Sequence, residues 1–192
     1  MAVPEREDLR IQKTKKKLFE TFIEMLAEKN FEDITVNELC SRAQIRRATF
    51  YKHFEDKMCF CTYVLQVFRH RFDRSIWKKS IPDATADYYI AYATELIEFI
   101  DNNEKMVTNL LSSSMLGSLM NIVLSQNFKD TLSRLESSEK QGMMLVTSAN
   151  TVTAMLSGGV CVSVLTWLHT KKEKPKEMLI KELSSIIAKI LN

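Results

Sequence analysis

The side chains best suited to chemistry lie between residues 35 and 57, where cations, hydroxyls and an imidazole follow one another closely. Arginine and lysine can donate to O6 and N7 of guanine, threonine offers a hydroxyl and a methyl, and alanine can touch the methyl of thymine. Lysine, tyrosine, histidine and threonine also suit phosphate oxygens, which orient a protein on DNA. We predict DNA contacts by these residues: Thr35, Asn37, Arg46, Arg47, Ala48, Thr49, Tyr51, Lys52, His53 and Lys57.

Two short helices joined by a tight turn would position this set. Thr35 and Glu38 fit a capping box, in which each side chain satisfies a free backbone N–H of the other, so a helix is expected from Thr35 to about Ala43. A second helix is expected from Arg46 to His53, after the turn. The inward positions are Val36, Leu39, Ala43 and Ile45. A basic second helix in such a pair can enter the major groove, whereas a lone basic helix is more often only a solvated face.

The composition of the chain predicts an all-α fold. Its 192 residues are 45% hydrophobic, enough for a core, and 4 Gly and 3 Pro are too few for a turn-rich β architecture. Apolar spacings of three and four residues predict helices before and after the pair. The expected ranges are 9–28, 56–78, 89–100, 106–111, 115–135, the uncharged stretch 142–168, and 175–191, with a polar loop at 136–142, which makes about nine helices.

The stretch from Gly142 to Leu168 contains no charged residue and is long enough to span a bilayer. Interior polar residues and the run from Ser157 to Gly159 make it less apolar than a typical spanning helix. We therefore expect no membrane contact and a helix buried on all sides in an assembly. Because the last helix has two apolar lines, we predict a homodimer through helices 143–169 and 175–191, with a thick intramolecular core as the alternative.

The sequence predicts neither catalysis nor metal binding. His53, His70 and His169 lie far apart, and the four cysteines have no partner at zinc-ligand spacing. We expect no enzyme activity, no cofactor and no metal site, and reduced thiols in a cytoplasmic protein. The first residues show no apolar core after their charges, so no signal peptide is expected.

The residues Ile34–Cys40 and Thr49–Lys57 resemble the N-terminal signature of TetR-type transcriptional regulators. The resemblance implies a three-helix DNA-binding domain at 1–56 and a helical domain for ligand binding and dimerisation at 57–192. It also implies a dimer that places two recognition helices in successive major grooves. By motif position, the implied phosphate contacts are Thr35, Tyr51, His53 and Lys57, and the implied base contacts are Arg47, Thr49 and Lys52. A second, weaker resemblance links residues 158–178 to the C-terminal domain of dihydroxyacetone-kinase regulators.

Two positions depart from the TetR pattern. Gln44 stands where the family usually has glycine in the turn, so glutamine must adopt a left-handed or distorted conformation. Arg46 stands where the family often has a serine or another capping residue, so the recognition helix loses a side-chain cap and gains a cation.

The resemblance also implies an unknown small-molecule effector, for which aromatic and methionine side chains could line an apolar cavity. The candidates are Phe68, Phe72, Tyr89, Tyr92, Phe99, Met106, Met115 and Met120, most of which could equally pack the core. The predicted function is a ligand-responsive, homodimeric repressor of transcription that binds a palindromic operator in double-stranded DNA. The alternative is a TetR-like ligand-binding module that acts as a protein partner or coactivator without DNA recognition of its own.

Overall fold

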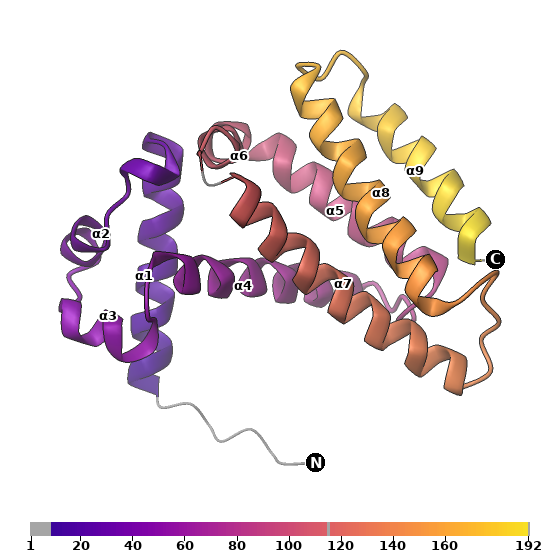
Figure 1. Ribbon diagram of the computed structural model, residues 1–192, viewed down its shortest axis with the longest axis horizontal. Helices are drawn as coiled ribbons and strands as arrows, with labels where there is room; N and C mark the ends of the chain where they lie inside the picture. The colour runs from indigo at the N-terminus through magenta and orange to yellow at the C-terminus, as the bar shows by residue number, and fades with distance from the viewer. Residues whose placement is uncertain (1–8, 115, 192) are drawn as a thin grey trace. The chain divides into compact units, whose positions relative to one another are not determined.

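The computed structural model describes residues 9–114 and 116–191, and these residues form nine α-helices and one short 3₁₀ helix. In chain order they are α1 (Leu9–Glu28), η1 (Phe31–Asp33), α2 (Val36–Arg42), α3 (Arg47–His53), α4 (Lys57–Lys78), α5 (Ala86–Asn102), α6 (Glu104–Leu111), α7 (Leu116–Lys140), α8 (Ala149–His169) and α9 (Lys176–Leu191). Figure 1 labels these helices along the chain. The prediction of an all-α chain is confirmed for the described residues.

The predicted boundaries around α7 and α8 are wrong by several residues. The polar stretch expected as a loop is helical up to Lys140, because its glutamate, serine and lysine residues extend a solvent-exposed helix as readily as they form a loop. The chain turns at Gly142, whose φ of 100° favours glycine. α8 begins at Ala149 rather than at residue 143, because Ser148 caps it by accepting a 3.3 Å hydrogen bond from the N–H of Thr151.

By packing, the chain divides into two compact units, and each is described by itself. The first unit comprises Met1–Leu65 and Asn103–Leu119, within which α1 packs against α2 and α6. Its core is aromatic: Phe22 meets Phe31 edge to face at 6.2 Å and Phe60 at 5.3 Å, and Phe50 lies 5.7 Å from Phe60. The predicted functional boundary after residue 56 stays a prediction, since by packing this unit also holds the first turns of α4 and all of α6.

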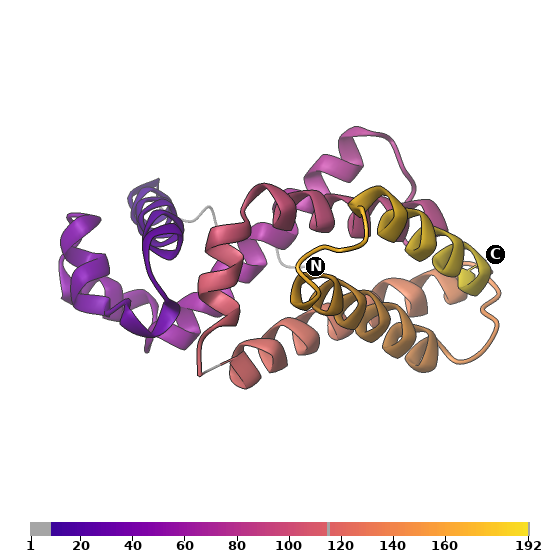
Figure 2. The same ribbon diagram turned by 90° about the horizontal axis from the view of Figure 1, so that it is seen from above.

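The second unit comprises Gln66–Asn102 and Met120–Asn192. Its helix α9 packs against α5 and α8, and α8 and α9 lie side by side in both views (Figures 1 and 2). The inner face of α9 is formed by Leu179, Leu183, Ile187 and Leu191. Ile186 of the same helix is exposed, so α9 has apolar surface beyond what this chain covers.

Helix α8 is long and apolar enough to cross a membrane, with a mean hydropathy of 1.6 over its most apolar window. Length and composition alone do not distinguish a spanning helix from a helix of a protein core. The expectation that α8 is buried on all sides holds for one face only, which consists of Ala149, Val152, Thr153, Leu156, Val164 and Trp167. On another face Met155 is 59% and Val162 63% exposed, so this chain buries α8 on one side only in its described residues.

Candidate nucleic-acid interface

The first helix of the predicted pair begins where the sequence indicates. Thr35 has extended backbone angles, and its Oγ1 accepts a 3.1 Å hydrogen bond from the N–H of Glu38, which confirms the cap. The reciprocal half of the capping box is replaced by ion pairs. The Glu38 carboxylate pairs with Lys29, at the end of α1, and lies 3.5 Å from Arg42. The pair with Lys29 joins α2 to the residue that follows α1, and the pair with Arg42 lies within α2.

The turn between α2 and α3 has the strained conformation that its sequence predicts. Gln44 has a φ of 53°, in the left-handed region that non-glycine residues enter at a cost. Its N–H donates to the carbonyl oxygen of Ser41 at 3.1 Å, and the N–H of Ile45 donates to that of Cys40 at 2.9 Å, which closes the C-terminus of α2. The turn therefore forms without glycine.

Helix α3 begins without a side-chain cap, as predicted for Arg46. A backbone hydrogen bond replaces the missing side-chain cap in part, because the N–H of Thr49 donates to the carbonyl oxygen of Arg46 at 2.8 Å. The buried residue of the helix is Phe50, which has no exposed surface and packs against Phe54 and Phe60. A single buried anchor thus fixes which side of α3 faces outward.

Seven of the ten predicted DNA-contact residues are exposed, namely Thr35, Asn37, Arg46, Arg47, Ala48, Tyr51 and Lys52. Thr49 and His53 are half-buried on the flanks of α3. Within the part of the chain that the structure describes, Arg46, Arg47 and Lys52 have no ion-pair partner. The guanidinium of Arg47 lies 5.9 Å from the ring centroid of Tyr51, a cation–π contact that gathers two of these side chains on one patch.

Lys57 differs from the other nine predicted DNA-contact residues, because backbone carbonyls of the protein already accept hydrogen bonds from its ammonium group. Its Nζ donates to the carbonyl oxygens of Phe31 and Ile34, both at 2.8 Å, and to that of Glu32 at 3.4 Å. The same atom lies 4.2 Å from the ring centroid of Phe31. These contacts tie the start of α4 to the segment before α2. A contact from Lys57 to phosphate stays a prediction, and it would have to compete with these three carbonyls.

Sequence comparison assigns this region to a family. Residues 18–58 match the bacterial regulatory proteins of the tetR family. They are a tetR-family DNA-binding domain. A further 41% identity over 51 residues relates the chain to YxbF of Bacillus subtilis, an uncharacterised regulator of the helix-turn-helix type, and this match spans 26% of the chain and 13% of YxbF. The matched family consists of bacterial regulatory proteins, and the match covers residues 18–58 of this chain.

Solved structures extend the likeness in fold beyond the tetR-family domain. A TetR-family regulator from Syntrophomonas wolfei has a TM-score of 0.68 at 15% identity, over 92% of this chain and 93% of the other. The fatty acid degradation regulator FadR of Bacillus halodurans has a TM-score of 0.64 at 16% identity, over 90% and 97%. FadR of Bacillus subtilis, solved with stearoyl-CoA, has a TM-score of 0.56 at 16% identity, over 90% of this chain and 97% of the other. The described chain therefore has the TetR fold.

Four of the predicted effector residues contact one another through their rings. Phe68 lies 4.6 Å and Phe72 5.6 Å from the ring of Phe99, and Phe72 meets Tyr92 edge to face, so these rings of α4 and α5 pack on one another. Met106 is buried in the first unit, Met120 is half-buried in the second, and Met115 lies outside the described residues. Tyr89 is buried, and its hydroxyl has no hydrogen-bond partner among the described residues.

A cleft of about 1070 Å³ lies elsewhere in the second unit, between the end of α4, the α4–α5 turn and α7. None of the eight predicted effector residues lines it. Its wall contains the ion-paired Arg134, which no periodicity in the sequence singles out, because its partners Asp73 and Asp83 are distant in the chain. The predicted effector residues stay a prediction.

Proposed function

We propose that this chain is a homodimeric, ligand-responsive repressor that binds a palindromic operator in double-stranded DNA of the bacterial cytoplasm. One observation carries the DNA-reading part. Arg47 and Lys52 project from a helix anchored by the buried Phe50, and in the described residues neither forms an ion pair. Cations held on a short helix and left without ion-pair partners suit guanine edges and phosphates.

The homodimer is supported by the surface of α8 and α9. Met155, Gly159 and Val162 lie at intervals of four and three residues, which places them on one face of α8. A Cβ atom added at Gly158 or Gly159 would meet nothing within 4 Å, so no other part of the described protomer covers this face at the glycines. Met178 and Ile186 of α9 are exposed as well. An isologous dimer on these helices would bury them and present two copies of α3 to a palindrome.

The effector is supported by less specific observations. The buried hydroxyl of Tyr89 lacks a partner in the described chain, and such a group costs about 1–3 kcal/mol unless a ligand or water satisfies it. Two structural neighbours are FadR proteins, and one of them was solved with stearoyl-CoA, which makes an acyl-CoA a reasonable first compound to test. The resemblance of residues 158–178 to dihydroxyacetone-kinase regulators stays a prediction.

The test is a selection from random double-stranded DNA by the purified protein. We expect an enriched inverted repeat, and no enrichment by a variant carrying Arg47→Ala and Lys52→Ala. A variant with Lys129→Ala and Lys140→Ala, which loses the same charge from exposed positions of α7, serves as the matched control and should enrich the same repeat.

Equal enrichment by all three proteins would contradict the assignment of α3 as the recognition helix. If a folded, dimeric wild-type protein enriches no sequence, with or without stearoyl-CoA, the alternative of a protein-binding module without DNA recognition is favoured. Affinity for an enriched repeat should also fall steeply with salt, by about a thousandfold or more between low and moderate concentrations, whereas an apolar protein contact should not.

A further inference from the structure

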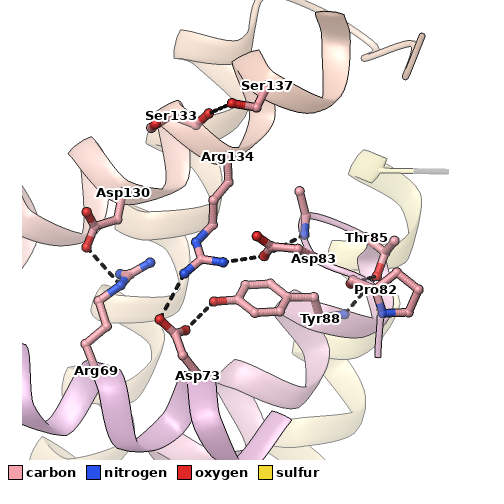
Figure 3. A network of polar contacts seen from close by, with 11 residues as sticks. Arg69, Asp73, Pro82, Asp83, Thr85, Tyr88, Asp130, Ser133, Arg134 and Ser137 are labelled. Carbon is pink, nitrogen blue, oxygen red and sulfur yellow. Dashed lines mark hydrogen bonds and ion pairs between the residues drawn. The ribbon is translucent and has the colours of Figure 1, made fainter. Parts of the chain in front are cut away.

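The cleft of the second unit has a wall that is fixed by a network of charged and hydroxyl groups (Figure 3). Arg134 of α7 lies between two carboxylates: its Nη2 is 2.9 Å from Asp73 Oδ2 of α4, and its Nη1 pairs with Asp83 in the α4–α5 turn. Tyr88 of α5 donates a 2.6 Å hydrogen bond to the other oxygen of Asp73. Three helices and a turn thus hold the wall in place.

The carboxylates of the network, Asp73 and Asp83, have their partners within the network itself. The Arg134 guanidinium lies 5.0 Å from the ring centroid of Tyr88, so it is held from three sides. Burial, and the hydrogen bond to Asp73, raise the pKa of the Tyr88 hydroxyl, so that group stays a donor to the carboxylate. Because both carboxylates share one guanidinium, they leave a single negative charge on this wall.

The last two turns of α4 also line the cleft and contribute cations. Arg74 and Lys78 line the cleft four residues apart, and His70 lies one turn before them on the same line. Arg74 and Lys78 are exposed, and neither has an ion-pair partner in the described part of the chain. Their two positive charges outweigh the single negative charge of the network.

The same turns of α4 contribute an aromatic ring to the cleft. Trp77 lines the cleft and is 81% exposed, which is unusual for the largest apolar side chain, and Ile81 and Pro82 of the turn extend the apolar surface. The volume lies just above the range typical of small-molecule sites, in which apolar walls carry a few placed polar groups. A ring that stacks on Trp77 would hold an attached anion beside Arg74 and Lys78.

We propose that this cleft binds small aromatic carboxylic acids, with the ring against Trp77 and the carboxylate between Arg74 and Lys78. The site is separate from the predicted effector residues, and the proposal does not depend on DNA binding. The fixed Arg134 network supplies a wall that needs no ordering when the acid binds, which favours affinity.

Isothermal titration calorimetry with 2-naphthoate tests the proposal, with the neutral 2-naphthylmethanol as the matched probe. We expect the acid to bind about tenfold more tightly than the alcohol, because only the acid uses the two cations. The variant with Arg74→Gln and Lys78→Gln should lose that difference, and Trp77→Ala should weaken both probes. The variant with Lys129→Gln and Lys140→Gln, which removes two charges outside the cleft, should bind as the wild type does.

Two results would overturn the proposal. One is equal affinity for the acid and the alcohol in the wild type, which would indicate apolar adsorption. The other is wild-type affinity for 2-naphthoate in both the Arg74/Lys78 variant and Trp77→Ala, which would place binding elsewhere. All substituted residues are exposed, and thermal unfolding of each variant verifies that its fold is intact.

Discussion

Lys57 donates a 2.8 Å hydrogen bond from its Nζ to the carbonyl oxygen of Phe31, and thereby joins the first turn of α4 to the segment that leads into α2. Burial lowers the pKa of this lysine from its ordinary value. Both the desolvation of the ammonium group and its hydrogen bonds to carbonyls indicate that this cation points into the protein. The family resemblance implies a phosphate contact at this position, and the geometry instead favours a role in positioning the DNA-reading helices.

The salt dependence of DNA binding distinguishes these two roles of Lys57. For Lys57→Met we expect weaker binding to all sequences, and a stability lower by about 1–3 kcal/mol because three carbonyls lose a donor. The slope of log affinity against log salt should stay unchanged. A slope smaller by about 0.9 would instead identify a lost phosphate contact. Lys52→Met, on exposed α3, is the comparison in which a smaller slope is expected.

The turn residue Gln44 offers a test of backbone strain. Gln44→Gly should raise stability by up to about 1 kcal/mol, because glycine adopts a φ of 53° without the cost that a side chain brings. Gln44→Ala keeps that cost and loses the 3.2 Å hydrogen bond from Lys17, so it should not stabilise. Urea unfolding measures both variants. Equal stability of the glycine and alanine variants would contradict a strained turn.

The proposed dimer interface can be tested at a glycine of α8. Gly159→Leu should weaken the dimer about tenfold or more, since an added Cβ meets nothing in its own protomer and the leucine would meet the partner in the proposed interface. Gly117→Leu on α7 is the matched control, because its added Cβ also has open space. Sedimentation equilibrium measures the dissociation constants. Dimers of equal strength in both variants would place the interface on another face.

Glu32 links η1 to the residues after α6, and this link should depend on pH. Hydrogen bonds from Ser114, through its side chain and its backbone N–H, hold the pKa of Glu32 below its ordinary 4.5, with a smaller contribution from Ser113. A lowered carboxyl pKa stabilises the fold above 4.5, and the stabilisation is lost as the pH falls through the folded-state pKa. The unfolding midpoint of the wild-type protein should therefore be higher than that of the Glu32→Gln variant at pH 7. The difference between the two midpoints should shrink below pH 4.5. A constant difference would contradict the linkage.

Local signals in the sequence predict the DNA-reading helices well. The bounds of α1, the Thr35 cap, the missing cap at Arg46 and the left-handed turn at Gln44 each depend on neighbouring residues, so pattern and propensity determine them. The polar residues after Leu135 illustrate the limit, because exposed helices and loops share the same composition.

Contacts between distant residues could not be predicted in this way. Lys57 reaches carbonyls more than twenty positions away, and Arg134 pairs with Asp73 from another helix. Every residue has a backbone carbonyl, so the sequence does not show which carbonyls accept hydrogen bonds from Lys57. The neighbours of Arg134 in the sequence, serine and leucine, do not indicate its ion-pair partners either. The cleft beside Arg134 depends on such pairings, so only the three-dimensional arrangement reveals it.

The ion pairs that fasten α2 to α1 use Glu28, Lys29, Glu38 and Arg42, and none of them involves the outward residues of α3. The buried residue of α3 is Phe50. Under the proposed function, stability and DNA preference would be encoded by separate residues, and substitutions at Arg47, Ala48 or Lys52 could accumulate without unfolding the domain. Such a division makes operator preference an evolvable property: gene duplication followed by a few changes on one helix face could direct a copy of this protein to new promoters.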